Sequence, residues 1–162
     1  MIFAVRPVDP VGVRSSERAQ VRILLAVDGS ESALNATRKL VEMAALLKEP
    51  PNVELVTVHL PVPPIGGIST VVTHDMLEHH YREEGEAALA EAKRILDSGG
   101  LAYTAHVFVG KPAHTIAEQA QRLDCDAIYM GTRGMSTVSS ILVGSCATKV
   151  LHLAHVPVFL VH

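Results

Sequence analysis

Short apolar segments alternate with longer amphipathic segments from residue 21 onward. The short segments are rich in β-branched residues and predict strands, whereas the longer ones carry apolar residues at helical spacing. The strands are expected at residues 21–28, 53–60, 101–110, 125–131 and 156–162. The helices are expected at residues 30–47, 73–96, 112–123 and 145–153. Such alternation is typical of repeated βα units around a parallel sheet.

The pattern within the strands indicates their places in the sheet. The first and fourth are almost continuously apolar, as in central strands covered on both faces. The third alternates in part and the last contains Pro157, which suits sheet edges. With right-handed crossovers, these features predict an α/β fold, an open doubly wound five-stranded parallel sheet in the order 3-2-1-4-5 with helices on both faces. Ligands of such sheets bind beyond the carboxyl ends of the strands, here between the first and the fourth.

Composition and charge narrow the class of protein. The 162 residues suit one domain, and no apolar run approaches the roughly 18 residues that cross a bilayer. The formal net charge is −3 and aromatic residues make up 4%, so neither a basic nucleic-acid surface nor a base-stacking platform is expected. We therefore expect a soluble cytoplasmic protein without a membrane or nucleic-acid partner, in which Cys125 and Cys146 are free thiols.

The first twenty residues differ from the rest of the chain. Prolines and charged residues interrupt any apolar core of signal-peptide length. Residues 1–20 are therefore expected to be a flexible N-terminal extension, and residues 21–162 to form the folded domain.

The stretch GTRGMSTVSSILVGS follows the fourth strand and leads into the last helix. Gly131 and Gly134 stand at the strand end, and Gly144 directly precedes Ser145 at the helix start. Glycine lets a ligand approach the backbone closely, and a helix N-terminus offers unpaired N–H groups to anions. With Ser145 as a hydroxyl donor and Arg133 as a counter-charge, the pattern predicts an anion or nucleotide site. In the alternative, the glycines only shape a turn and Ser145 caps the helix.

The spacing Gly-x-x-Gly, nine residues and Gly-Ser resembles the signature of the universal stress protein family, in its ATP-binding branch. The segments ILLAVDGSESA, VTVHL, VGKPAHTI and VPVFLVH resemble further landmarks of that family, in the same order. The resemblance covers about residues 21–162, and the signature is complete. It implies an adenine-nucleotide-binding protein, with ATP as the cofactor, alone or with Mg²⁺, and a role in stress response or signalling.

The resemblance also implies the residues of the site. Asp28 matches the acidic residue that faces the nucleotide, and Val58 matches the position that contacts adenine. The alternative for Asp28 is a turn-forming role before Gly29. The full implied set is Ala26, Val27, Asp28, Val58, Met130, Gly131, Arg133, Gly134, Gly144, Ser145, Cys146 and Ala147. No catalytic residue and no metal ligand is assigned.

The last predicted strand is apolar and lies at a sheet edge, where a bare strand invites aggregation. Pairing of residues 156–162 with the same strand of a second copy would cover it. The family that the chain resembles dimerises through this strand, so we expect a homodimer.

Other nucleotide and catalytic motifs are absent. The sequence has no G-x-x-x-x-G-K-[ST], no G-x-G-x-x-G after the first strand and no G-x-S-x-G. No general base is evident beside the predicted phosphates, so slow ATP hydrolysis stays open and dedicated catalysis is not expected. Two alternatives remain: a dimeric interaction module that binds no nucleotide, and a small hydrolase or transferase that depends on Asp28 or Ser145.

Two weaker signals concern metal binding and modification. His74 and His79 are five residues apart and align poorly on a helix, so a solvated helix start is preferred to a metal site. The stretch between the glycines carries four hydroxyl residues near an expected γ-phosphate, which we interpret as polar loop residues, with self-phosphorylation as a minor hypothesis. They are Ser136, Thr137, Ser139 and Ser140.

Overall fold

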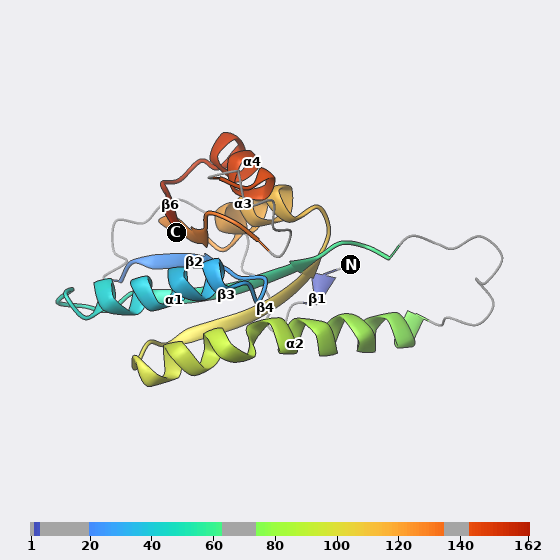
Figure 1. Ribbon diagram of the computed structural model, residues 1–162, viewed down its shortest axis with the longest axis horizontal. Coiled ribbons are helices and arrows are strands. Elements are labelled where there is room, and N and C mark those ends of the chain that lie inside the picture. Colours follow the sequence, from blue (N-terminus) through green and yellow to red (C-terminus); the bar gives the residue numbers. More distant parts are fainter. Residues whose placement is uncertain (1, 4–19, 63–73, 135–142) are drawn as a thin grey trace.

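The computed structural model describes residues 2–3, 20–62, 74–134 and 143–162. Figure 1 shows a sheet between two layers of helices, with α1 (Glu31–Ala44) and α2 (His74–Ser98) on one face. Helices α3 (Pro112–Arg122) and α4 (Ser145–Leu153) cover the other face. The predicted arrangement of helices on both faces is therefore confirmed.

The sheet has the predicted order, with one strand added. Its strands are β1 (Ile2–Phe3), β2 (Arg22–Ala26), β3 (Asn52–His59), β4 (Tyr103–Val109), β5 (Ala127–Gly131) and β6 (Val158–Val161). They follow the order β1-β4-β3-β2-β5-β6, so the parallel strands β2 to β6 confirm the predicted order 3-2-1-4-5.

The strand β1 was not predicted. It pairs antiparallel with β4, Phe3 opposite Val107, so β4 is not an edge strand along its whole length as its alternation suggested. Two residues are too short to carry a periodic pattern, so β1 could not be predicted from the sequence.

The hydrophobic core lies on both faces of the sheet. Leu25, Leu55 and Tyr129 pack towards α1 and α2, whereas Leu24 and Ile128 pack towards α3 and α4. Alternate residues of β2 and β5 thus enter different core layers, and burial on both faces explains why these strands read as continuous apolar runs.

The helix bounds follow from local signals. Ser30 caps α1, and its hydroxyl oxygen accepts from the Ala33 N–H at 3.3 Å. Helix α1 ends at Ala44, earlier than expected, and Leu46 beyond it is 85% exposed and adds no core contact. Helix α2 ends before Gly100, whose positive φ of 67° suits glycine after a helix. Within the described parts of the chain, no helix is long and apolar enough to span a membrane.

Candidate functional site

The end of β5 and the start of α4 meet at one place. The Gly144 N–H donates to the Thr132 carbonyl oxygen at 2.7 Å. A Cβ built on Gly144 would lie 3.6 Å from the Arg133 Cα and 4.0 Å from the Gly134 N. Gly144 is also the N-cap of α4, with φ −70° and ψ 160°, and no side chain caps the helix start in the described part of the chain. The first amides of α4 therefore open beside the backbone of residues 132–134.

Asp28 lies at the same junction, just beyond β2. Its Oδ1 accepts a hydrogen bond from the Ser30 N–H at 3.0 Å. Its Oδ2 faces Gly134, because a Cβ on that glycine would come within 2.6 Å of this oxygen. The carboxylate also acts on α4: the pKa of the Cys146 thiol is raised first by burial and then by the Asp28 charge, against a smaller opposing effect of Lys149. Asp28 is thus held between the starts of α1 and α4.

Two serine hydroxyls of the α1 start hold the backbone that follows β5. Ser32 Oγ accepts from the Arg133 N–H at 3.3 Å and lies 3.3 Å from the Val161 carbonyl oxygen, to which it donates. Ser30 Oγ donates to the Arg133 carbonyl oxygen at 3.4 Å. The Thr132 N–H donates to the Val161 carbonyl oxygen at 2.8 Å. The turn that carries the signature is therefore fastened to α1 on one side and to β6 on the other.

Gly131 is glycine because helix α1 lies directly against it. A Cβ at this position would come within 2.5 Å of Ser32 Oγ and 2.8 Å of the Ala33 N. The space that we expected to admit a ligand is filled at this position by the start of α1. Gly134 and Gly144 are the signature glycines that lie at the junction of Asp28 with α4.

The Arg133 guanidinium contacts the imidazole of His162 at the end of β6. Its Nη2 lies 3.0 Å from Nε2 and 3.3 Å from Nδ1 of that ring. Thr132 Oγ1 lies 3.2 Å from Nδ1. The sequence did not reveal Ser32 or His162, because both contacts arise from strand register, with Gly131 opposite Val161. A second hydroxyl two residues after the Ser30 cap was the available signal for Ser32.

The remaining residues of the predicted nucleotide site differ in how deeply their side chains are buried. The side chain of Val27 packs in the core beneath α1 and α2. The side chains of Ala26, Met130 and Ala147 pack in the core beneath α3 and α4, so these four can offer a ligand only backbone groups. Val58 is half-buried, and Ser145 is exposed at the first position of α4.

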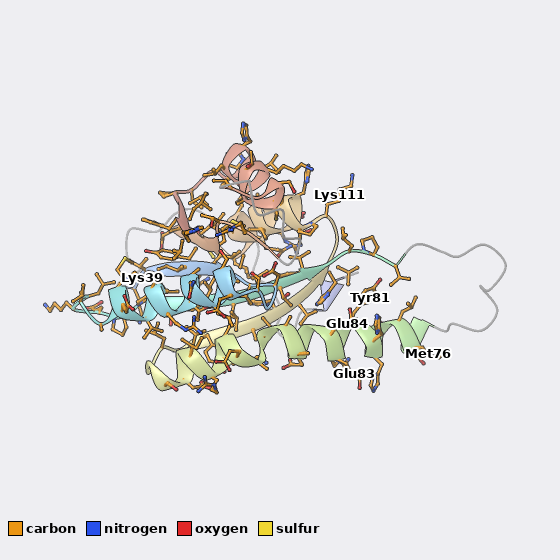
Figure 2. The ribbon with its side chains drawn as sticks, viewed as in Figure 1. Lys39, Met76, Tyr81, Glu83, Glu84 and Lys111 are labelled. Carbon is orange, nitrogen blue, oxygen red and sulfur yellow. The ribbon has the colours of Figure 1, made fainter. Side chains whose placement is uncertain are left out.

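A separate polar cluster joins β3 to α2. His59 Nδ1 lies 3.8 Å from a Glu84 carboxylate oxygen, and its Nε2 is buried without a hydrogen-bond partner among the described residues. Tyr81 accepts from the Val62 N–H at 2.6 Å. Figure 2 shows Tyr81 and Glu84 on the side of α2 towards the sheet and Glu83 on its outer side. Burial lowers the pKa of His59, Glu84 opposes this shift and His80 adds to it.

Two surface hollows lie away from the predicted site. One, of about 160 Å³, lies between α3 and the end of α4, beside His114 and Leu153. The other, of about 440 Å³, lies on the outer part of α2 beside Met76 and His80. Neither contains a residue of the predicted set or the convergent amides of the α4 start, so we base no site on them.

The histidines and the loop hydroxyls are the residues of the metal and modification hypotheses. Among the described residues, no group of three or more His, Cys, Asp or Glu side chains could hold a metal ion. His79 instead lies 3.2 Å from Glu83, four residues along α2. The side chain of His74 and the hydroxyl residues 136–140 lie outside the described residues. Neither Cys125 nor Cys146 forms a disulfide, as predicted.

The fold and the site define a doubly wound α/β protein. Its glycine-lined turn faces a helix start that no side chain caps among the described residues, at the point where strand order reverses. The sequence model of the universal stress protein family matches residues 21–162. The chain therefore belongs to the universal stress protein family.

Relatives and solved structures agree with this assignment. Universal stress protein MJ0531 of Methanocaldococcus jannaschii is 29% identical over 150 residues, which cover 92% of this chain and 86% of the relative. The solved structure of the hypothetical protein MJ0577 has a TM-score of 0.73 at 26% identity and covers 87% of this chain and 94% of its own. A universal stress protein from Archaeoglobus fulgidus, solved in complex with dAMP, has a TM-score of 0.58 at 25% identity and covers 88% and 98%.

Proposed function

We propose that this universal stress protein binds an adenine nucleotide, ATP, between the carboxyl ends of β2 and β5, and that its nucleotide state governs a role in stress response or signalling. One observation carries the proposal: the start of α4, which no side chain of the described residues caps, opens beside Gly134 and the Asp28 carboxylate at the point where strand order reverses. The dAMP held by the Archaeoglobus fulgidus relative supports the choice of an adenine nucleotide.

The phosphates would lie against the start of α4. The N–H groups of residues 145–147 point out of the first helical turn, and the helix dipole favours negative charge there. Ser145 is exposed and can add its hydroxyl to a phosphate oxygen. Gly144 lets the start of α4 lie close to the turn, since a Cβ there would lie 3.3 Å from the Thr132 carbonyl oxygen.

The ribose would lie next to Asp28. A carboxylate repels phosphate but accepts well from hydroxyl groups, so its place at this junction suits a sugar. In the register of β2 with β3, Ala26 pairs with Val56. Asp28 and Val58 each lie two residues beyond this pair, at neighbouring ends of the two strands. The adenine would then lie over the end of β3 beside Val58. Any Mg²⁺ would come with the phosphates, and we assign no catalytic residue.

Calorimetry with ATP tests the proposal. We expect the unmodified protein to bind one ATP per chain, and Gly144→Val to weaken binding at least roughly ten-fold because its side chain enters the approach to the amides. His152→Ala is the matched control, because His152 is exposed on the last turn of the same helix. No binding at millimolar ATP, or equal affinity for Gly144→Val in a folded state, would exclude the proposal and favour an interaction module.

The homodimer expected from the sequence is part of the same proposal. In the described residues β6 pairs with β5 alone, and Phe159 on it is 46% exposed. A second copy of this chain, paired through residues 156–162, would cover that edge. Cys125 and Cys146 form no disulfide, which fits the reducing cytoplasm in which we place the dimer.

A further inference from the structure

A chain of three side chains runs from the buried end of β5 to the surface. Thr132 is 9% exposed, and its Oγ1 lies 3.2 Å from Nδ1 of His162. The Nε2 of the same ring lies 3.0 Å from Nη2 of Arg133. The same Nη2 lies 3.3 Å from Nδ1, so the guanidinium contacts both nitrogens of the ring. The threonine hydroxyl thus contacts the same ring that contacts the arginine.

The backbone of Arg133 is fixed, but its side chain has an exchangeable partner. Hydroxyls of Ser30 and Ser32 hold its carbonyl oxygen and its N–H, so the main chain cannot follow a ligand. The guanidinium, by contrast, contacts an imidazole ring on an exposed residue. A guanidinium forms stronger and often bidentate hydrogen bonds with phosphate, so a phosphate within reach would draw it from the ring.

The contact also places the guanidinium on one side of the site. His162 follows β6, which pairs with β5 on the side away from β2. Asp28 follows β2, so the Arg133 guanidinium held by His162 and the Asp28 carboxylate lie on different sides of β5. From these contacts we infer that His162 is a positioning residue that retains the Arg133 guanidinium at the end of β6. By retaining it, His162 limits how strongly the site prefers nucleotides with more phosphates over those with fewer. This inference rests on the proposed function, since it concerns the same nucleotide.

Calorimetry with ATP, AMP and adenosine tests the inference on His162→Ala, Arg133→Ala and the double variant. We expect His162→Ala to tighten ATP binding by roughly 3- to 10-fold, the equivalent of one released hydrogen bond, and to leave adenosine binding unchanged. Arg133→Ala should weaken ATP binding, and His162→Ala should have no further effect in that background. His162→Gln offers another acceptor and should keep the ratio of ATP to adenosine affinity that the unmodified protein has. His155→Ala, at an exposed histidine before β6, is the matched control.

The outcomes separate the two proposals. If the unmodified protein binds none of the three ligands, the proposed function fails and this inference with it. If it binds ATP but His162→Ala leaves the ratio of ATP to adenosine affinity unchanged, the inference alone is overturned. An effect of His162→Ala that persists without Arg133, or that changes adenosine equally, also overturns it, because the histidine would then act on the fold.

Discussion

The Cys146 thiol reports on the charge at the junction of Asp28 with α4. Burial is the main reason that its pKa is raised, and the Asp28 carboxylate raises it further. A higher pKa leaves less thiolate at neutral pH, and thiolate is the form that alkylating reagents attack. The rate of alkylation at Cys146 should therefore respond to removal of the Asp28 charge.

Asp28→Asn should accelerate alkylation of Cys146 by iodoacetamide at pH 7.5, because removing the charge lowers the pKa of the thiol. ATP should slow the reaction in the unmodified protein by covering the start of α4. Peptide mass spectrometry follows both thiols together, with buried Cys125 as the internal control. Equal rates in the two proteins would place Asp28 farther from the thiol than the structure does.

His59 makes stability depend on pH. Its pKa is lowered in the folded protein, mainly by burial, so below its ordinary value of 6.5 the unfolded chain binds more protons than the folded one. This favours unfolding, so stability should fall as the pH drops from about 6.5 towards the lowered pKa. We predict a flatter dependence of Tm on pH between 6.5 and 5 in His59→Leu. His114→Leu, at an exposed histidine of α3, should keep the original slope, and equal slopes in all three proteins would refute the prediction.

At the scale of single residues, the sequence could predict those that belong to a local pattern. Asp28, Gly134 and Gly144 stand at strand ends and helix starts, and the structure brings them together. Ser32 and His162 could not be predicted, because their contacts require the register of β5 with β6 and the approach of α1.

Among the elements, the approach of α1 to β5 depends on Gly131. We predict that Gly131→Ala costs about 1–3 kcal/mol of unfolding free energy, because its Cβ would come within 2.6 Å of the Ser32 carbonyl carbon, a backbone atom that cannot move alone. Gly134→Ala should cost less, since among the described residues its Cβ would meet the end of the Asp28 side chain, which can move. Urea denaturation measures both. An equal or reversed order would contradict the packing described for α1.

The elements themselves were largely predictable, because each strand and helix has its own period and its own cap. Helix α4 has the predicted bounds. The parallel strands and the other helices differ from their predicted bounds by a few residues at their ends. Ends are harder to predict because tertiary contacts decide them: α1 stops where the chain beyond Ala44 finds no core, as Leu46 shows.

For the molecule as a whole, the open side of β6 is the feature that the proposed dimer explains. Phe159→Asp should convert a dimer into a monomer at micromolar concentration, because it places a charge on the strand that would pair between copies. Leu46→Asp is the matched control, because it changes an equally apolar and more exposed residue at the far end of α1. Analytical ultracentrifugation measures the mass. A monomer before substitution, or a dimer after it, would contradict this assembly.

The overall fold could be predicted from the sequence because a small set of rules on handedness and strand order governs doubly wound sheets. The short strand β1 did not, since nothing in residues 2–3 distinguishes them from the extension around them. The site was predictable in outline because strand order alone places the ends of β2 and β5 together.

Amide chemical-shift mapping with ATP tests the central claim most directly, since it shows where on the molecule a nucleotide lies. We predict that ATP shifts the amide resonances of Asp28, Gly134 and residues 144–147, which surround the uncapped start of α4. A titration that leaves these resonances unchanged, or shifts chiefly those around His114 and Leu153, would contradict it.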